Sequence, residues 1–594
     1  MTHRVAVLDK EACQPKKCGL ECIKYCPVNK SGADCIVMNQ EIGKAQIDEN
    51  ICNGCGICVK VCPFDAITIV NLAEELKTDK IHQYGINSFR LYRIPSLKKG
   101  QVMGLLGRNG IGKSTMVGIL SGGLKPNLGN YSSPPEWSDI LKHFHGTELK
   151  SHFEKIANKD LKASIKPQQV YNLTKAFDGT GRELLEKYDE RNKIPDLVQE
   201  LGLQNALDTK LQDLSGGELQ RIAVAVAASK ESDFYFFDEP SSYNDVFQRM
   251  GVARVIQNLA KIGKSVMVVE HDLTLLDYLS DFIEIIYGEP AAYGIVANVL
   301  STKVGINVFL DGYLPNENVR FRDAAFRFDA STSTDEFVMT ENITEYPALE
   351  KKFGNFFLTV DAGRVRKSEV LGVVGANALG KTTMMKMIAG VEKPDSGSID
   401  TKIKIAYKPQ YLSNEYDVEV LALLEKANNG PIDGTTEEEI ILNPMKIKKL
   451  YTKSVKNLSG GELQKVAIAA CLLQKVDLYA LDEPSAFLDV EDRIAMAKLI
   501  QRFVRSYGKS AIIIDHDIQL MDLISDSLVI FHGTPGREGR ATAPMSKADG
   551  MNQFLKSLDI TYRRDETSMR PRVNKSESRL DREQKQTGHY YYRN

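Results

Sequence analysis

Cysteines with the spacing of iron–sulfur ligands stand near the start of the chain. Cys52, Cys55, Cys58 and Cys62 precede Pro63 in the run CNGCGICVKVCP. In a C-x2-C-x2-C-x3-C-P run of this kind, three thiolates bind one 4Fe-4S cluster and the fourth binds a second cluster. A zinc ribbon, the alternative, pairs C-x2-C units across longer gaps. The spacing therefore favours iron–sulfur chemistry.

A second cysteine group lies upstream and also ends before a proline. Its spacing, C-x4-C-x3-C-x3-C-P, is looser than the ferredoxin pattern that the first group matches. Exchange of the last thiolate between the groups would give each cluster four ligands. Cys35 is then left over, and a small buried residue is its simpler interpretation. The predicted ligand sets are Cys13, Cys18, Cys22 and Cys62 for one cluster, and Cys26, Cys52, Cys55 and Cys58 for the other.

Two glycine-rich loops of a phosphate-binding type lie further along the chain. GRNGIGKST and GANALGKTT both fit G-x4-G-K-[ST] after apolar runs. Backbone N–H groups and a helix N-terminus in such a loop surround phosphate oxygens, its lysine reaches the β and γ oxygens, and its hydroxyl binds Mg2+. The residues predicted to bind nucleotide in these loops are Gly107, Asn109, Gly110, Gly112, Lys113, Ser114 and Thr115, and Gly375, Asn377, Gly380, Lys381, Thr382 and Thr383.

The same series of motifs follows each loop, so the chain contains an internal repeat. LSGGELQ occurs twice, then FYFFDEP and LYALDEP, with 23 positions from the serine to the aspartate in both halves. VVEHD and IIDHD come next. From about Tyr84 to His532, this order resembles that of the ATP-binding-cassette ATPases.

The resemblance implies a role for each motif residue. In these cassettes the aspartate binds Mg2+, the glutamate after it polarises the attacking water, and the histidine and the glutamine of KPQ approach the γ-phosphate. Phosphoryl transfer requires mainly positioning and charge neutralisation of this kind. The implied catalytic residues are Glu239, Glu483, His271 and His516, and the implied Mg2+ ligands are Ser114, Gln168, Asp238, Thr382, Gln410 and Asp482.

The resemblance also implies that each signature motif faces the P-loop of the other cassette. Ser215 would then complete the site of Lys381, and Ser459 would complete that of Lys113. A serine and a helix N-terminus there can bind the γ-phosphate. The implied signature residues are Ser215, Gly217, Ser459 and Gly461.

Aromatic residues ahead of the loops are candidates for stacking on adenine. Tyr84 and Phe353 lie 23 and 22 residues before the first glycines of the loops. Either ring could instead belong to a core. Ala378 stands where the first loop has Gly110, which predicts a different loop geometry and unequal sites if a positive φ is needed there.

The elements that must position these residues follow from the motifs. Each P-loop needs a buried strand before it and a helix after it, and each Asp–Glu pair ends a strand. We therefore predict a multidomain α/β fold: a ferredoxin-like domain with two 4Fe-4S clusters, followed by two P-loop cassettes arranged head to tail. The predicted domains are 1–73 for the iron–sulfur domain, 74–290 and 326–534 for the cassettes, and 291–325 and 535–594 for two hinges, the second with a basic tail.

Two segments distinguish the halves. From Lys113 to Ser215 is 102 residues but from Lys381 to Ser459 only 78, so the first cassette carries an insertion, expected as two helices over about 131–166. Its lysines fit either a solvated helix face or a contact with RNA or protein. Residues 563–594 contain nine Lys or Arg and five Asp or Glu, and are expected to be disordered or to contact phosphates. The lysines are Lys150, Lys155, Lys159, Lys162 and Lys166.

The overall composition is that of a cytoplasmic protein. Lys and Arg number 76 against 78 acids, so no global attraction to nucleic acid or membranes is expected. No apolar run reaches the 18 or so residues that span a bilayer, and no export signal opens the chain. Nine of the ten cysteines lie in the first 62 residues, which fits a local metal site rather than a disulfide scaffold.

The complete arrangement resembles the RNase L inhibitor family, the ribosome-recycling ATPases of cassette subfamily E, and favours an archaeal source. The resemblance implies ATP-driven splitting of ribosomes after termination or stalling, with two clusters and two Mg-ATP. It implies a monomer with paired cassettes, contacts to the small subunit and its rRNA, and a release-factor or Pelota-type partner. An iron–sulfur electron-transfer or cluster-assembly ATPase is the main alternative. A transporter ATPase and a cassette translation factor that only binds ribosomes are weaker alternatives.

Overall fold

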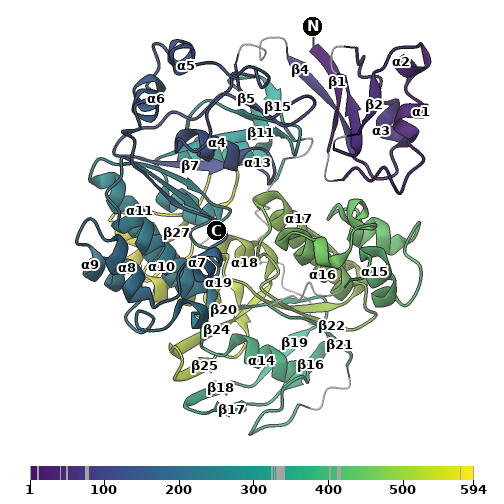
Figure 1. Cartoon of the computed structure of the whole chain (residues 1–594). Coiled ribbons are helices and arrows are strands. Elements are labelled where there is room, and N and C mark those ends of the chain that lie inside the picture. Colours follow the sequence, from purple (N-terminus) through teal and green to yellow (C-terminus); the bar gives the residue numbers. More distant parts are fainter. Residues whose placement is uncertain are drawn as a thin grey trace.

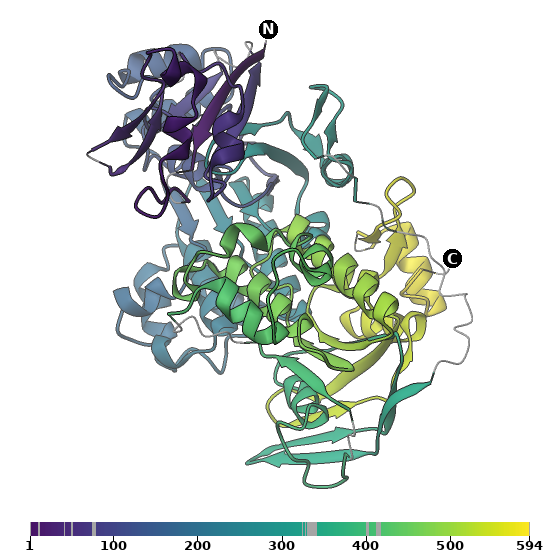
Figure 2. The same ribbon diagram turned by 90° about the vertical axis from the view of Figure 1, so that its right-hand side faces the viewer.

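The computed structural model describes residues 2–9, 12–40, 42–48, 51–73, 79–322, 325–326, 328, 341–399, 403–410, 417–575 and 577–592. They form a small cysteine-rich domain and two larger α/β domains (Figure 1). In the two views of Figures 1 and 2 the cysteine-rich domain, in purple, lies at the end of the molecule farthest from β17 and β18. None of the described helices is long and apolar enough to cross a membrane.

The cysteine-rich domain has two antiparallel strand pairs and short helices. β1 (Thr2–Leu8) pairs with β4 (Ile67–Ala73), and β2 (Ile36–Asn39) pairs with β3 (Lys44–Ile47). The helices α1 (Glu21–Lys24), α2 (Pro27–Lys30) and α3 (Ile57–Val61) have four or five residues each. Its core is a few aliphatic side chains together with cysteines, so apolar burial alone supplies little stability.

The first cassette is built on a mixed sheet in which the strand before the P-loop runs parallel to both of its neighbours. β7 (Val102–Leu106) is buried along its whole length, as expected for an interior parallel strand, and leads into α4 (Lys113–Leu120). In the described residues the sheet order is β5 (Lys80–Gln83), β6 (Arg90–Tyr92), β12 (Tyr293–Val296), β11 (Phe282–Glu289), β7, β10 (Ser265–Val269), β9 (Phe234–Asp238) and β8 (Ala163–Lys166), with β13 (Leu300–Ser301) on β11. Its other helices include α7 (Asn172–Ala176), α8 (Gly181–Tyr188), α9 (Ile194–Glu200), α10 (Gly216–Ser229), α11 (Val246–Lys261) and α12 (Leu273–Leu279).

The second cassette repeats this topology strand for strand. β20 (Val370–Val374) takes the place of β7 and leads into α14 (Lys381–Ile388). The described order is β17 (Leu349–Phe353), β18 (Phe356–Val360), β25 (Glu538–Ala541), β24 (Ser527–Thr534), β20, β23 (Ser510–Ile514), β22 (Leu478–Asp482) and β21 (Ile405–Lys408), with β26 (Met545–Ser546) on β24. A separate pair joins β16 (Asn342–Tyr346) to β19 (Gly363–Arg366), and the helices include α15 (Val420–Asn428), α16 (Gly460–Leu472), α17 (Val490–Tyr507) and α18 (Ile518–Ile524).

The insertion consists of α5 (Trp137–His143) and α6 (Leu149–Ala157), which pack on the first cassette. Phe153 of α6 stacks on Phe144 with 4.5 Å between the ring centroids, and it is fully buried in the core beside α4. The expected boundary at 166 is wrong, because β8 belongs to the sheet. Lys166 is accordingly no part of a basic helix face: it is buried, and its Nζ donates to the carbonyls of Asp238 and Glu239.

The cassettes also extend beyond the expected hinge boundaries. β12 and β13 pair with β11, so the first sheet continues past 290, and β25 and β26 pair with β24, so the second continues past 534. The first hinge retains α13 (Thr302–Asp311), β14 (Tyr313–Leu314) and β15 (Val319–Arg320). Residues 329–340, with which the second cassette was expected to begin, lie outside the described residues.

The expectation of a disordered tail is wrong. The C-terminal segment forms α19 (Lys547–Leu558), β27 (Tyr562–Arg564), β28 (Pro571–Val573) and α20 (Arg579–Thr587), drawn in yellow in Figure 2. Arg570 is fully buried and donates to Asp277 of α12 at 3.2 Å, and Tyr591 donates to Asp522 of α18. The tail therefore joins the two cassettes.

Candidate functional site

Each P-loop lysine lies folded against the carbonyls of its own loop. Lys113 Nζ donates to Gly107 O at 3.2 Å, and Lys381 Nζ donates to Gly375 O at 2.9 Å. Burial lowers the pKa of Lys113, and it lowers that of Lys381 to about 8. Each lysine is the first residue of a helix whose N-terminus has no side-chain cap, so backbone N–H groups there can bind an anion. A bound phosphate would contact both the lysine and these N–H groups.

The loop backbones are alike despite the alanine in the second loop. The backbone φ angle is +78° at Gly110 and +57° at Ala378. The carbonyl of Gly110 accepts a hydrogen bond from the N–H of Ala291 at 3.1 Å, and the carbonyl of Ala378 accepts one from the N–H of Gly536 at 3.0 Å. The predicted difference in loop geometry is therefore wrong. The alanine takes the left-handed conformation at a cost of roughly 1–2 kcal/mol.

The presumed catalytic carboxylates lie at the carboxyl ends of β9 and β22. Parallel pairing with β10 and β23 places the histidines that follow those strands at the same edge. Gln168 Nε2 donates to Glu239 Oε1 at 2.7 Å, and His271 Nε2 lies 3.5 Å from the same oxygen. In the second site the corresponding distances from Glu483 are 2.7 Å to Gln410 and 3.3 Å to His516.

Backbone strain marks both glutamates. Glu239 and Glu483 have backbone φ angles of +44° and +45°, a conformation that residues other than glycine rarely adopt. Each is held there by its N–H, which donates to a carbonyl of the adjacent strand at 2.9 and 2.8 Å. Strain of this kind concentrates at functional sites, so it supports the assignment of these residues.

Burial raises the pKa of both aspartates, and in the second site the pKa of the neighbouring glutamate is shifted in the opposite direction. Burial and the adjacent glutamate raise the pKa of Asp238 to about 6, and burial similarly raises that of Asp482 to about 6. Burial opposes ionisation of Glu483 as well, but His516, Lys381 and Gln410 lower its pKa to about 2. Lys113 and Lys166 near Asp238, and Lys408 and Lys381 near Asp482, offset only part of the effect of burial on the two aspartates.

The oxygen donors around Asp482 fit a magnesium ion. Thr382 Oγ1 donates to Asp482 Oδ2 at 2.7 Å, whereas the buried Oδ1 has no hydrogen-bond partner among the described residues. Carboxylate, hydroxyl and amide oxygens are the ligands that Mg2+ prefers, and a divalent cation would satisfy this carboxylate.

The first nucleotide site is completed by the second cassette. A cleft of about 1020 Å³ is lined by Lys113, Asp238 and Glu239 from one side and by Ser459 and Gly461 from the other. Ser459 N-caps α16 and Ser215 N-caps α10, each within a capping box. Ser459 of the second cassette and Lys113 of the first therefore line the same cleft.

A contact between the cassettes that the sequence analysis missed lies beside both P-loops. Asp245 Oδ2 accepts from the backbone N–H of Asn377 at 2.8 Å, and Asp489 Oδ2 lies 3.5 Å from the backbone nitrogen of Asn109. Both aspartates follow their catalytic glutamate by six positions and N-cap a long helix. Equal spacing in both halves is the signal that could have found them.

The proposed adenine-stacking rings are not core residues. Tyr84 is 55% exposed, lines the cleft, and its hydroxyl lies 3.1 Å from Thr115 Oγ1. Phe353 is 44% exposed, with Lys351 Nζ 5.2 Å from its ring centroid. Phe89, which the sequence analysis did not select, also lines the cleft.

The cysteine side chains gather at two places in the domain. Cys13, Cys18, Cys22 and Cys62 line one small cavity. Burial, with Cys62, Cys13 and Cys18 nearby, raises the pKa of Cys22 to about 11, and burial with Cys52, Cys55 and Cys26 nearby raises that of Cys58 to about 12. Cys35 is buried against Cys26 and Cys52.

The cysteine sets fit a cluster better than a single ion. Within the described residues, no three His, Cys, Asp or Glu side chains are close enough together to hold one metal ion. A 4Fe-4S cube is a larger body than an ion, so its four thiolates stand farther apart.

Known protein families match most of these features. The ABC transporter family matches residues 95–242 and 360–486, the possible Fer4-like domain of RNase L inhibitor matches 3–34, and the 4Fe-4S binding domain matches 45–68. These matches confirm the predicted order of an iron–sulfur domain and two cassettes.

Individual relatives match over nearly the whole length. An uncharacterised ABC transporter ATP-binding protein of Methanocaldococcus jannaschii is 48% identical over 99% of this chain and 97% of that protein. Translation initiation factor RLI1 of Saccharomyces cerevisiae is 44% identical over 99% of this chain and 98% of that protein. A chain in a structure of ribosome-bound archaeal Pelota and ABCE1 is 49% identical, covers 100% of both chains and has a TM-score of 0.95.

Proposed function

The chain belongs to the RNase L inhibitor (ABCE1) family of ATP-binding-cassette proteins, and we propose that it is an ATP-driven ribosome recycling factor. The observation that carries the proposal is the match over the full length to the ribosome-bound archaeal ABCE1 structure, with the iron–sulfur domain, both cassettes and the insertion in place. A second relative is described as an archaeal ribosome recycling factor in complex with the ribosomal stalk protein aP1, and is 48% identical with a TM-score of 0.82 over 88% of this chain and 100% of that one.

The chain is an ATPase, and we assign the chemistry to residues that both sites share. Ser114, Asp238 and Gln168 would hold Mg2+ in the first site, and Thr382, Asp482 and Gln410 in the second. The bound ion neutralises phosphate charge. Glu239 and Glu483 orient and polarise the attacking water, and they are placed for this by their glutamine and histidine neighbours.

Cassette closure would convert ATP binding into motion. ATP in the first cleft touches Lys113 from one cassette and Ser459 from the other only when the cassettes are together. It therefore stabilises the closed state by its differential affinity, and hydrolysis removes that bias. The second site would pair Lys381 with Ser215 in the same way.

The cysteine domain would carry two 4Fe-4S clusters and move as a rigid body. One cluster would be held by Cys13, Cys18, Cys22 and Cys62, and the other by Cys26, Cys52, Cys55 and Cys58. Bound clusters crosslink a domain that has few apolar core residues. A stiff domain of this kind transmits cassette motion to the ribosome without bending.

The expected partners are those of the relatives. The insertion and hinges would contact the small subunit and its rRNA, with exposed Lys155, Lys159 and Lys162 near phosphates. A release factor or Pelota-type protein would act alongside the chain, which would work as a monomer in the cytoplasm.

The proposal is tested by sedimentation of whole archaeal ribosomes in a sucrose gradient. Ribosomes incubated with the protein, ATP and a Pelota-type factor should yield free subunits. Omission of ATP is the control. Ribosomes that remain whole under all conditions, while the protein hydrolyses ATP, would contradict recycling.

A further inference from the structure

A cluster of buried charges lies between the cassettes, behind the phosphate-binding loops. Arg249 of α11 and Arg493 of α17 occupy matching positions, four residues after the aspartate that caps each helix. Arg249 Nη1 donates to Asp272 Oδ2 at 2.7 Å, and Arg493 Nη1 donates to Asp517 Oδ2 at 3.1 Å. All four side chains are at most 14% exposed.

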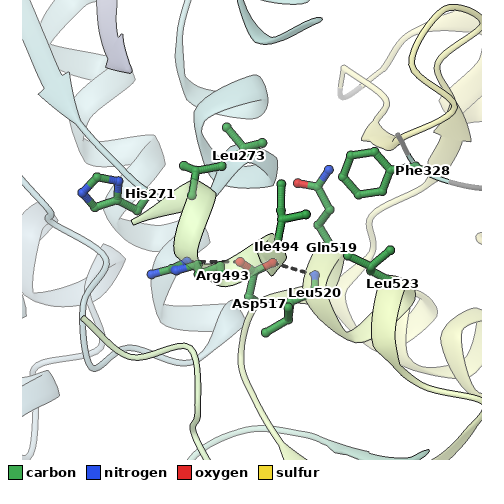
Figure 3. A pocket seen from close by; sticks show the side chains of 10 residues that line it. His271, Leu273, Phe328, Arg493, Ile494, Asp517, Gln519, Leu520 and Leu523 are labelled. Atoms are coloured by element: carbon green, nitrogen blue, oxygen red, sulfur yellow. Dashed lines mark hydrogen bonds and ion pairs between the residues drawn. The ribbon is translucent and has the colours of Figure 1, made fainter. Parts of the chain in front are cut away.

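Each arginine belongs to one cassette and lies beside the histidine of the other, His516 or His271, which we call the switch histidine of that site. Arg249 Nη1 lies 3.4 Å from the carbonyl oxygen of His516, and Arg493 lines one small cavity with His271 (Figure 3). In Figure 3 His271 lies to the left of Arg493, whereas Ile494, Leu523 and Phe328 lie to its right. Phe328 itself is 7% exposed.

Stability alone gives a poor account of this cluster. Buried ion pairs pay a desolvation cost that their attraction often only balances. Burial and then the nearby carboxylate of Asp272 raise the pKa of Asp517 to about 6. When the cassettes meet, the two aspartate carboxylates come close together, and the two arginines neutralise their negative charge.

Each arginine also pairs with the aspartate that follows the histidine of its own cassette, so it links the histidine turns of the two cassettes to each other. Asp272 and Asp517 directly follow His271 and His516 and N-cap α12 and α18. His271 Nε2 lies 3.3 Å from Lys113 Nζ and 3.5 Å from Glu239 Oε1. A shift of this turn would therefore move the histidine relative to the reacting phosphate.

We propose that Arg249 and Arg493 are positioning residues that act across the cassette interface, each fixing the switch histidine of the opposite site for hydrolysis. Arg493 would support the site of Glu239, and Arg249 the site of Glu483. Each site would then hydrolyse ATP at full rate only when the other cassette is docked. The inference rests on the catalytic assignments proposed above.

The test measures each site alone in the full-length protein. With Glu483→Gln silencing the second site, Arg493→Gln should lower the remaining kcat about tenfold or more, and Arg249→Gln about twofold or less. With Glu239→Gln the order should reverse. KM for ATP should change little, because the P-loops bind the nucleotide. Arg493→Lys and Arg249→Lys, which keep the charge, should restore part of the rate.

Matched controls exist on the same helices. Arg505 of α17 and Arg254 of α11 form exposed ion pairs with Asp526 and Glu200. Their glutamine variants should leave both single-site rates unchanged. Thermal unfolding of every variant separates lost folding from lost positioning.

Crossed dependence is the decisive result. Equal losses at both sites, or a larger loss at the site of the cassette that carries the substituted arginine, would overturn the proposal. Full turnover in both glutamine variants of the glutamates would instead contradict the catalytic assignment. The same arginine comparison, made with Lys113→Ala and Lys381→Ala as the silencing changes, would then decide the proposal.

Discussion

The carboxylate of Asp245 in the first cassette accepts a hydrogen bond from the backbone N–H of Asn377 in the second at 2.8 Å. The reciprocal pair, Asp489 and Asn109, is longer at 3.5 Å. The contact to the second P-loop is therefore the shorter of the two, although the loop backbones match. The inequality of the two sites, which was expected from Ala378, stays a prediction, and the facing aspartates are a place where the two halves differ.

Asp245→Asn should weaken cassette pairing more than Asp489→Asn. A hydrogen bond to a charged acceptor contributes about 1.5–3 kcal/mol, and asparagine loses the charge while still capping its helix. We expect the Asp245 variant to need about tenfold more ATP to close, measured by a distance probe across the cassettes. Equal effects of the two variants would show that the difference between the two hydrogen-bond distances does not affect the free energy of cassette pairing.

Glu239→Gln and Glu483→Gln should each trap ATP in the substituted site. The amide keeps the shape of the side chain but cannot polarise water, and loss of such a group costs about 100- to 10,000-fold in rate. Retention of radiolabelled ATP after gel filtration measures the trap, with Glu583→Gln, an exposed residue of α20, as the control. Normal turnover in both variants would remove the assigned role.

Much of the site was predictable because its motifs are short and contiguous. Each P-loop, each Asp–Glu motif and each histidine motif is a contiguous stretch of at most nine residues. Because the strands that carry these motifs are parallel, their carboxyl ends meet at one edge of the sheet. Lys166 was misplaced because its neighbours have a basic helical pattern, whereas a sheet strand begins at Ala163. Its amine is satisfied by two carbonyls some 70 residues away, which local sequence does not reveal.

The tail could not be predicted from its composition. A basic, polar segment is typical of disorder, yet Arg570 and Arg572 share Asp277, which lies nearly 300 residues earlier. Tyr591 and Tyr592 similarly share Asp522. Order in this segment depends on partners in two distant helices, and a sequence contains no local sign of such pairs.

Glu284 should make the protein less stable as the pH rises. Burial raises the pKa of this carboxyl to about 8, well above its value in an unfolded chain. Its favourable contribution is present below pH 4.5 or so and is lost as the pH rises through about 8, because the folded state must then bury a charge. Glu284→Gln cannot ionise, so its Tm should exceed that of the parent increasingly from pH 6 to 9.

The size of that effect is bounded by about 1.4 kcal/mol per pKa unit. Calorimetry at pH 6, 7, 8 and 9 measures it. Glu289→Gln, at the half-buried end of the same strand, is the matched control and should show no such divergence. A constant difference between Glu284→Gln and the parent across this range would contradict the buried charge.

Cys35→Ser should leave about eight irons per chain, because the two predicted ligand sets are complete without this cysteine. Cys35 is nevertheless buried against Cys26 and Cys52, so it could replace one of them. Iron analysis of anaerobically purified protein measures the occupancy, and Cys58→Ser is the matched control, expected to lose about four irons. A loss of four irons in Cys35→Ser would make it a ligand and displace one member of its set.

The ATPase rate should be the same in oxidised and reduced preparations of the protein. If the clusters act as crosslinks, their electron count does not alter the shape of the domain that the cassettes move. The electron-transfer alternative requires the opposite, because its turnover would be coupled to the redox state of the clusters. Anaerobic ATPase assays after treatment with dithionite or with a mild oxidant distinguish these cases, with cluster integrity followed by absorbance. A rate that changes severalfold while the clusters remain intact would favour the redox function over the mechanical one.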